Sequence, residues 1–443
     1  MSSAPDPFPL SFSLPVNVSS TSGLSQAAVI AAGGEGNVFV AWEERALELL
    51  LVSRSTDSGA TFATARPVVP GGEDLSFGQI RMLSPSSTDL QMAFTAFDTY
   101  YGGAEIVYAG SSDAAQTFPV VTVVSKLDEI NSYAPDIATG WGIAVVWSNS
   151  NLSTGTTSVE FSVSADQGAT FTPPRRLDTA LAYAMCPAVA VSGDGAALAA
   201  WIQNDDPYGN DNGSDIFFAM SSDSGATFSM PVNISNNDEK SWCPRLAVDE
   251  TGTIYVVWTE GNAFVDMRLF FTISTDGGKS FAAPRVLAGP AGSMSPSIAV
   301  TKTGALWIAW MSGGNTEPFR SFAIRSLDRG LTFSAPAAIP GGYEIASVAS
   351  NEVFAAWHEV PQGGEWSDVF ASRGIVILCG DANADGRLTA SDALYVLRVA
   401  VGIGTCAPAV CDFNGSGAIS ASDALQVLRA AVGNAVVPHC PLQ

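Results

Sequence analysis

The sequence predicts an all-β protein, a seven-bladed β-propeller closed by its own N-terminal strand, followed by a small α-helical module. Three observations lead to this fold class. A motif of eight residues recurs six times, a longer apolar motif interleaves with it, and two acidic loops with following helices occupy the chain after residue 379. A repeat period near fifty residues is typical of propellers and related arrays.

The shorter motif, called the octet below, has the pattern S-x-D-x-G-x-[TS]-F. Its Asp can accept hydrogen bonds from nearby backbone N–H groups and its Gly allows a positive φ, so it predicts a turn. The Phe then returns to the core, and we expect the aspartates to be structural. Only the second copy departs, with Ala115 in place of Gly. The six copies occupy residues 55–62, 111–118, 164–171, 221–228, 274–281 and 326–333.

The longer motif begins near a Pro, contains a Gly-bearing turn and ends in Trp. Each copy is two apolar runs around a turn, which predicts a hairpin, and its mostly apolar positions predict strands buried on both faces. The terminal aromatic residues lie 47 to 57 residues apart. Four copies are clear, two are looser, and one has Phe94 in place of Trp: residues 135–147, 187–201, 244–258 and 296–310, then 28–42 and 345–357, then 79–94.

Each repeat unit therefore has four strands, namely the hairpin, a third strand, the octet turn and a fourth strand. The seventh unit has a third strand near 368–373 but no octet. Residues 11–18 resemble the fourth-strand segment 227–234, so we expect the N-terminal segment to complete the last blade. This closure removes exposed sheet edges and predicts a propeller over residues 1–373.

Composition limits the classes of function. A net charge of −23 argues against nucleic-acid binding, because phosphates would be repelled. No apolar run reaches about eighteen residues, so no transmembrane segment is expected. Residues 1–6 do not read as a secretory signal, and we expect that a signal was removed from an extracellular or cell-surface protein.

The octets and their spacing resemble the sialidase-like Asp-box (BNR repeat) propellers, and the resemblance covers about residues 10–373. In that family the box is a structural hairpin between the third and fourth strands. The family implies three substrate-binding arginines, one in an F/Y-R-I-P motif, with a Tyr nucleophile and acidic helpers. Here the start reads Pro7-Phe8-Pro9-Leu10, without that Arg. The catalytic motif therefore does not carry over.

In a four-stranded meander the first and third turns share one face, while the second turns and the blade connections share the other. The second face carries most acidic and aromatic loop residues, and loops on a rigid scaffold commonly hold binding sites. We expect aromatic side chains there to stack on sugar rings. The candidate ligand-binding residues are Arg81, Tyr183, Asp205, Asp206, Tyr208, Trp242, Arg245, His358 and Trp366.

Four carboxylates follow buried second strands closely and are weak catalytic candidates: Glu43, Asp98, Glu260 and Glu359. Paired carboxylates can hydrolyse glycosides. The alternative is that these four residues are solvated surface charges of an acidic protein, with no catalytic role. The first hypothesis is a secreted propeller directed at a glycan or another extracellular polymer. The alternatives are an exo-sialidase-type glycoside hydrolase and a non-catalytic structural or adhesive surface protein.

The C-terminal loops, residues 381–392 and 412–423, have the EF-hand pattern of oxygen ligands, with Gly at the sixth position and a carboxylate at the twelfth. Loop one offers three carboxylates and loop two only two, so we expect the first site to fill at lower Ca²⁺. The candidate ligands are Asp381, Asn383, Asp385, Arg387, Asp392, Asp412, Asn414, Ser416, Ala418 and Asp423.

Two loop–helix copies with Asp at the twelfth position resemble a type I dockerin, over residues 379–443. The resemblance implies two bound Ca²⁺ ions and a cohesin-like protein partner. In that family the tenth and eleventh loop positions, here Ala390-Ser391 and Ala421-Ser422, help to choose the partner. The alternative is a Ca²⁺-stabilised cap or an intramolecular interaction domain.

The six cysteines divide by region. Cys186 and Cys243 precede equivalent prolines in neighbouring units and are candidates for a cross-blade pair. An even number favours an oxidising compartment, and zinc is disfavoured because C-x-x-C is absent. The module repeat allows two pairings, of which the dockerin resemblance favours the first: Cys379–Cys440 with Cys406–Cys411, or Cys379–Cys406 with Cys411–Cys440.

Overall fold

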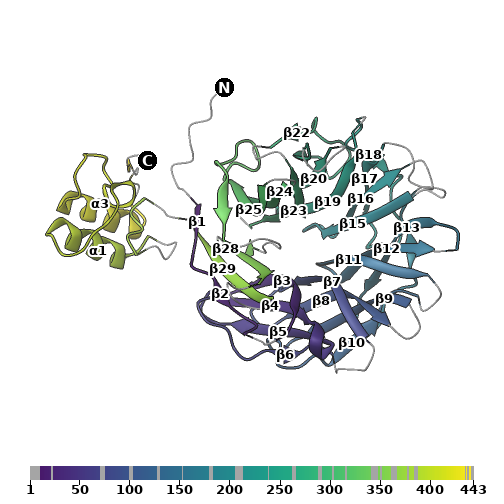
Figure 1. Cartoon of the computed structure of the whole chain (residues 1–443). Coiled ribbons are helices and arrows are strands. Elements are labelled where there is room, and N and C mark those ends of the chain that lie inside the picture. The colour runs from purple at the N-terminus through teal and green to yellow at the C-terminus, as the bar shows by residue number, and fades with distance from the viewer. Residues whose placement is uncertain are drawn as a thin grey trace.

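The computed structural model shows a ring of seven β-sheets with a helical module beside it, next to β1 and β29 (Figure 1). The structure describes residues 10–20, 23–69, 75–98, 103–126, 130–151, 153–178, 183–204, 213–237, 239–261, 266–287, 292–301, 304–314, 317–340, 348–349, 352–360, 367–376, 379–383, 388–434, 436 and 439–440.

Each of the first six blades is an antiparallel meander in chain order, with the first strand innermost. Blades one to three contain β3 (Ser25–Gly34), β4 (Asn37–Glu44), β5 (Leu49–Ser55), β6 (Arg66–Pro67); β7 (Leu75–Leu83), β8 (Leu90–Asp98), β9 (Gly103–Ser111), β10 (Val120–Val123); and β11 (Asn131–Thr139), β12 (Ile143–Asn151), β13 (Thr156–Ser164), β14 (Arg175–Arg176).

Blades four to six repeat this order, and a short 3₁₀ helix, η1 (Arg45–Leu47), lies in the second turn of blade one. The strands are β15 (Tyr183–Val191), β16 (Ala197–Asn204), β17 (Asp215–Ser221), β18 (Val232–Asn233); β19 (Ser241–Val248), β20 (Ile254–Glu260), β21 (Arg268–Ser274), β22 (Arg285–Val286); and β23 (Ser293–Val300), β24 (Leu306–Gly314), β25 (Glu317–Ser326), β26 (Ala337–Ile339).

The seventh blade joins both ends of the propeller sequence. It contains β27 (Val348–Ala349), β28 (Glu352–Glu359) and β29 (Asp368–Val376), and both β1 (Leu10–Phe12) and β2 (Val16–Asn17) pair with β29. Val16 lies opposite Ala371, and the side chain of Asn17 donates to Asp368 Oδ2 at 2.8 Å. The predicted closure of the ring by the N-terminal segment is confirmed.

Aromatic side chains fill the blades and the joints between them. The Trp that ends the hairpin motif is fully buried in six blades, and Phe94 takes this place in blade two. The Phe of one octet packs on an aromatic ring in the third strand of the preceding blade, with Phe228 on Phe161 and Phe281 on Phe218, both at 4.9 Å between centroids. Edge contacts of this kind add to the stability from buried area.

The octet forms the predicted turn. In the first copy, Asp57 Oδ1 accepts from the backbone N–H of Thr61 at 2.8 Å, and Ser55 Oγ accepts from Gly59 N at 2.9 Å. The hydrogen bonds from Thr61 and Ser55 lower the pKa of Asp57 to about 2. Ser58 N donates to Gly36 O in the first turn, so the first and third turns lie on the same face.

Both roles of the octet glycine are visible in the fourth copy. Gly225 has a φ of 80°, and a Cβ there would lie 2.5 Å from the ring of Phe161 in the preceding blade. In the second copy Ala115 adopts a φ of 62°, a conformation that L-residues rarely take.

The helical module contains α1 (Ala390–Ala400), α2 (Pro408–Cys411) and α3 (Ala421–Ala431), with α1 packed on α3. Thr389 and Ser420 each begin a helix through a capping box, with Asp392 and Asp423 as the reciprocal partners. Among the described residues, no helix combines the length and the apolar character needed to span a membrane. The disulfides are Cys186–Cys243, Cys379–Cys440 and Cys406–Cys411.

Candidate functional site

The innermost strands of blades one to six share a β-bulge at the same place. The residue within the bulge has a positive φ in five of them, for example Gln79 at 48° and Ala134 at 51°. Bulges redirect side chains and are common beside binding sites. Five of the residues that follow the bulges line the central channel and are called the bulge ring below, whereas Ala188 of blade four is buried in the core: Val29, Arg81, Asp136, Arg245 and Ser297.

A cavity of about 530 Å³ occupies the channel at this level. Its lining includes Trp242 near the start of β19, Thr259 near the end of β20 and Met267, which lie on the face predicted for the site. Among the described residues, its charged lining consists of Arg81, Asp136 and Arg245, and Trp242 lies at its rim. The cavity therefore carries a formal charge of +1 in a chain whose net charge is −23.

Asp136 is the acidic residue of this lining. Its Oδ1 is 3.9 Å from Arg81 Nε, and its Oδ2 accepts from the backbone N–H of Val189 in the next blade at 2.9 Å. Burial raises the pKa of Asp136, and the positive charges of Arg81 and Arg245 act against this shift. Asp136 is not among the residues predicted from the sequence, although Pro135-Asp136 occupies the same place in the repeat as Pro244-Arg245.

The two arginines are held in the same way. Arg81 Nη1 donates to the carbonyl of Ile80 at 3.0 Å, and Arg245 Nη1 donates to the carbonyl of Pro244 at 3.0 Å. In each case one of the five N–H donors of the guanidinium holds the head group to the backbone. Both candidates from the sequence are thus brought together in one cavity.

Trp242 presents an exposed ring beside this cavity. Its side chain is 43% exposed, and its Nε1 donates to Gly261 O at 3.4 Å. Arg268 and Glu239 form an exposed ion pair in the same blade, with 2.7 Å between Nη2 and Oε2, and they do not line the cavity. Trp242 is the aromatic candidate that the described structure places at the channel mouth.

Tyr183, another candidate, begins the inner strand of blade four and is half-buried. It lies near Tyr133 of blade three. Burial and the neighbouring Tyr183 raise the pKa of Tyr133 to about 12, so the Tyr133 phenol stays protonated near neutral pH. It can act as a hydrogen-bond donor but not as an anionic group.

Two of the carboxylate candidates are buried acceptors within the fold. Glu260 is 1% exposed and accepts from Trp258 Nε1 at 2.5 Å and from Asn237 Nδ2 at 2.8 Å. Burial raises the pKa of Glu260, and these hydrogen bonds oppose the shift. Glu43 is 2% exposed and accepts from Gln26 Nε2 at 2.5 Å and from Phe77 N at 3.3 Å. Neither lines the cavity.

The remaining propeller candidates are dispersed. Glu359 is exposed at the end of β28, and burial lowers the pKa of the neighbouring His358. Asp98 ends β8, and its side chain lies outside the described part of the structure. The same holds for the candidate residues Asp205, Asp206, Tyr208 and Trp366.

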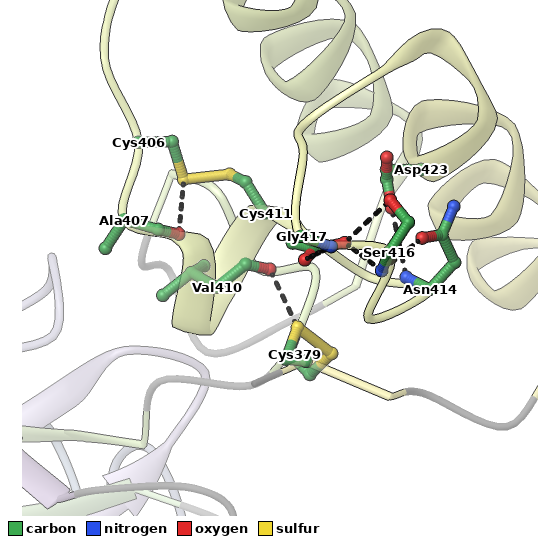
Figure 2. The surroundings of a disulfide bond; sticks show 11 residues. Cys379, Cys406, Ala407, Val410, Cys411, Asn414, Ser416, Gly417 and Asp423 are labelled. Atoms are coloured by element: carbon green, nitrogen blue, oxygen red, sulfur yellow. Dashed lines mark hydrogen bonds between the residues drawn. A yellow bond between two sulfur atoms is a disulfide. The ribbon is translucent and has the colours of Figure 1, made fainter. Parts of the chain in front are cut away.

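The second acidic loop is compact and rich in oxygen donors. Figure 2 shows Asn414, Ser416, Gly417 and Asp423 gathered near the Cys406–Cys411 disulfide. Asp423 Oδ1 accepts from Asn414 N at 3.0 Å, while the buried Asp412 accepts from Ser416 N at 2.9 Å and from Gly417 N at 2.8 Å. Two fully buried carboxylates are costly unless they are paired or bind a metal.

The first loop repeats this arrangement. Asp392 Oδ1 accepts from Asn383 N at 3.1 Å, and both Asp381 and Asp392 are buried. Asp385 and Arg387 lie outside the described residues. No group of three or more His, Cys, Asp or Glu side chains is arranged to hold a metal among the residues described. Loop two also carries amide, hydroxyl and carbonyl oxygens, including that of Ala418, and hard donors of this kind fit Ca²⁺.

Comparison with solved structures shows what the ring is similar to. Polysaccharide lyase Uly1 has a TM-score of 0.52 at 11% identity, covering 82% of this chain and 91% of that one. A protein of unknown function from Dyadobacter fermentans has a TM-score of 0.51 at 12% identity, with 83% and 99% covered. The Hadza microbial sialidase Hz136 has a TM-score of 0.42 at 12% identity, with 79% and 65% covered. At these identities the likeness concerns the fold.

No curated protein matches the chain. The model of the dockerin type I domain family matches residues 379–430, which contain both acidic loops and the helices that follow them. Type I dockerin domains bind calcium, in agreement with the donor set of the loops. Residues 379–430 of this chain form a dockerin type I domain, and a seven-bladed β-propeller precedes it.

Proposed function

We propose that this protein is an extracellular, glycan-directed propeller that is attached to a larger assembly through its dockerin domain. The ring over residues 1–373 holds the ligand at the mouth of its channel, and the module over 379–443 forms the attachment. The observation that carries the proposal is the cavity of about 530 Å³ with the exposed Trp242 at its rim. Stacking of a sugar ring on an exposed aromatic side chain is a common basis of carbohydrate recognition.

The proposal is for binding, and it assigns no reaction. Glu43 and Glu260 serve as buried acceptors and Glu359 is exposed away from the cavity lining. The three disulfides support an oxidising, extracellular location.

The test is retention on a panel of neutral and acidic polysaccharides in affinity electrophoresis. Trp242→Ala should abolish retention of the polymer that binds the unchanged protein. Tyr395→Ala is the matched control, since Tyr395 is 38% exposed in the dockerin domain and should leave retention unchanged. Equal loss in both variants, or retention of no polymer, would overturn the proposal.

For the module we propose two Ca²⁺ sites and a cohesin-type protein partner. The near-identical loops support this, because Asn383 and Asn414 each donate from Nδ2 to a serine hydroxyl eight residues on, both at 3.3 Å. Binding to an immobilised cohesin should require Ca²⁺ and be lost in chelator. Binding that persists in chelator would contradict the Ca²⁺-dependent attachment.

A further inference from the structure

We infer that Cys186 and Cys243 are positioning residues of the ligand site, because their disulfide holds the β-bulge of blade five and, with it, Trp242 at the rim of the channel cavity. The disulfide joins β15 to β19, the innermost strands of blades four and five. This inference rests on the proposed function, in which the ring of Trp242 stacks on the ligand, and it names what sets the position of that ring.

The two cysteines occupy equivalent places on neighbouring blades. Cys186 is the first residue of the bulge in β15, and Cys243 is the first residue of the bulge in β19, directly after Trp242. The described strands β15 and β19 belong to different sheets, so the backbone hydrogen bonds of a ladder do not connect them. Cys243 also lines the cavity, as Trp242 does. The disulfide is therefore a covalent cross-link in the channel wall, beside the proposed binding residue.

The bulge of blade five differs from the other five in its backbone. The first bulge residue has a positive φ, between 48° and 54°, in blades one to four and in blade six. Cys243 is the exception and does not take this left-handed conformation. A strained conformation of this kind persists only where the surrounding structure determines it. In blade five the bulge lacks that conformation and carries a covalent cross-link instead.

In blades three to five, the first bulge residue is linked to the preceding blade. The backbone N–H of Ala134 donates to Gln79 Oε1 of blade two at 2.7 Å, and that of Cys186 donates to Ser148 Oγ of blade three at 3.1 Å. In blade five the corresponding link is the disulfide from Cys243 to Cys186. Because Ser148 is fully buried, Cys186 is anchored to the interior of blade three. Cys243 is thus fastened to a residue whose own position is fixed.

The other contacts that the described structure gives the ring of Trp242 are weak. The side chain is 43% exposed, and its Nε1 donates to Gly261 O at 3.4 Å, beyond the usual distance of about 2.9–3.0 Å. Its backbone pairs with Thr259 at the last position of the ladder before the bulge. A ligand binds more tightly when the side chain that it contacts is already held in place, because less conformational freedom is lost on binding. The disulfide supplies this restraint.

The first experiment compares the full-length protein with the variant Cys186→Ala/Cys243→Ala by fluorine NMR after incorporation of fluorotryptophan. The protein contains ten Trp, and the signal that disappears in Trp242→Phe is that of Trp242. Removal of the disulfide should shift and broaden the Trp242 signal and leave most of the other Trp signals in place. This measurement needs no ligand.

The second experiment measures retention in affinity electrophoresis on the same panel of neutral and acidic polysaccharides. The disulfide-free variant should bind the retained polymer about fivefold more weakly than the unchanged protein, through the lost restraint on Trp242. Trp242→Ala should weaken binding strongly in the unchanged protein and only slightly in the disulfide-free variant, because the two changes act on the same contact.

Phe281→Ala is the matched control. Phe281 of the blade-five octet packs on Phe218 of blade four, with 4.9 Å between ring centroids. This contact joins the same two blades further from the channel, at the third strand of blade four. Its loss should lower the melting temperature and change neither the Trp242 signal nor retention.

A third measurement does not require the disulfide-free variant to fold. Dithiothreitol reduces the disulfide of the unchanged protein to two thiols and is itself oxidised to a cyclic disulfide. The disulfides of the dockerin domain are exposed to the same reagent, but all ten Trp precede residue 373, so the fluorine signals report on the propeller. The Trp242 signal should shift on reduction and return on reoxidation.

The outcomes separate this inference from the proposed function. An unchanged Trp242 signal in the folded variant or in the reduced protein overturns the inference, whether or not a polymer is retained. A shifted signal with unchanged retention overturns the role of the disulfide in binding. A shifted signal with no polymer retained by the unchanged protein supports the positioning of Trp242 and overturns the proposed function. An equal shift in Phe281→Ala would show general loosening of the two blades and would overturn the inference.

Discussion

Val16 lies directly opposite Ala371 in the antiparallel ladder between β2 and β29. The two ends of the propeller sequence are thereby joined within one sheet, in which β1 also pairs with β29. Val18, two residues further, is buried in the core cluster that includes Phe354 and Val369. Stability of the whole ring therefore depends on a short N-terminal segment.

Deletion of residues 1–20 should lower the stability of the propeller. Loss of the burial of Val18 alone removes about 1.5–3 kcal/mol, and the exposed edge of β29 should promote aggregation. Tryptophan fluorescence during thermal unfolding measures this specifically, because all ten Trp precede residue 373. Deletion of residues 1–9 is the control and keeps both strand pairings. Equal melting of the two truncations would argue against closure.

The octet aspartates should make the propeller sensitive to acid. The pKa of Asp223, like that of Asp57, is lowered to about 2, first by the hydrogen bond from a threonine hydroxyl. A lowered folded-state pKa stabilises the protein above about pH 4, and this contribution is lost as the pH falls through about 2. A variant with Asp→Asn at 57, 166, 223 and 276 should show a smaller drop in melting temperature between pH 4 and 2. An unchanged drop would contradict the assignment.

Substitution of Glu260 should affect stability more than binding. Glu260→Ala leaves the indole N–H of Trp258 and the amide of Asn237 without their acceptor, at a cost of about 1–3 kcal/mol. Glu260→Gln should cost less, because its amide oxygen can still accept. Chemical denaturation measures both. Glu359→Ala, at an exposed position, should change the free energy of unfolding by no more than about 0.5 kcal/mol. Loss of glycan binding by Glu260→Gln at full stability would instead indicate a direct role.

The two loops of the dockerin domain should bind Ca²⁺ with different affinities. Loop one has three carboxylates, whereas Ser416 in loop two replaces the third, and fewer charges weaken binding. Calorimetry should resolve a tighter and a weaker step, with the tighter step lost in Asp392→Ala and the weaker in Asp423→Ala. Ser416→Asp should tighten the weaker step. Two equal steps, or a tighter second loop, would contradict this expectation.

The ring was predictable from sequence because its signals are local and repeated. A Trp at a fixed place in each hairpin must be buried, and an octet must turn, so counting these motifs gives the number of blades. The closure followed from the same count, since one unit lacked its fourth strand and residues 11–18 resembled one. The disulfides Cys186–Cys243 and Cys379–Cys440 also agree with the equivalent positions and with the favoured pairing.

The site was predictable only in part. The direction of the side chains on the inner strands depends on a β-bulge, and no sequence pattern predicted that bulge. Arg81 and Arg245 are isolated cations near the starts of inner strands, which makes them candidates from the sequence, whereas nothing in the sequence distinguishes Asp136 from the many other acidic residues. Glu260 was selected as an acid near the channel. In a strand, however, residues two apart point to the same side, so Glu260 shares the side of Trp258 and serves its indole.

The bulge ring has a consequence for how such a protein acquires new ligands. At five of the six bulges the backbone path is set by strand pairing and by a residue of positive φ, as at Ala134, and not by the side chain that follows it. Exchange of Val29 or Ser297, which line the cavity, would therefore change the channel wall and leave the strand pairing in place. A propeller of this kind can acquire a different ligand by substitutions at such positions while its scaffold stays the same.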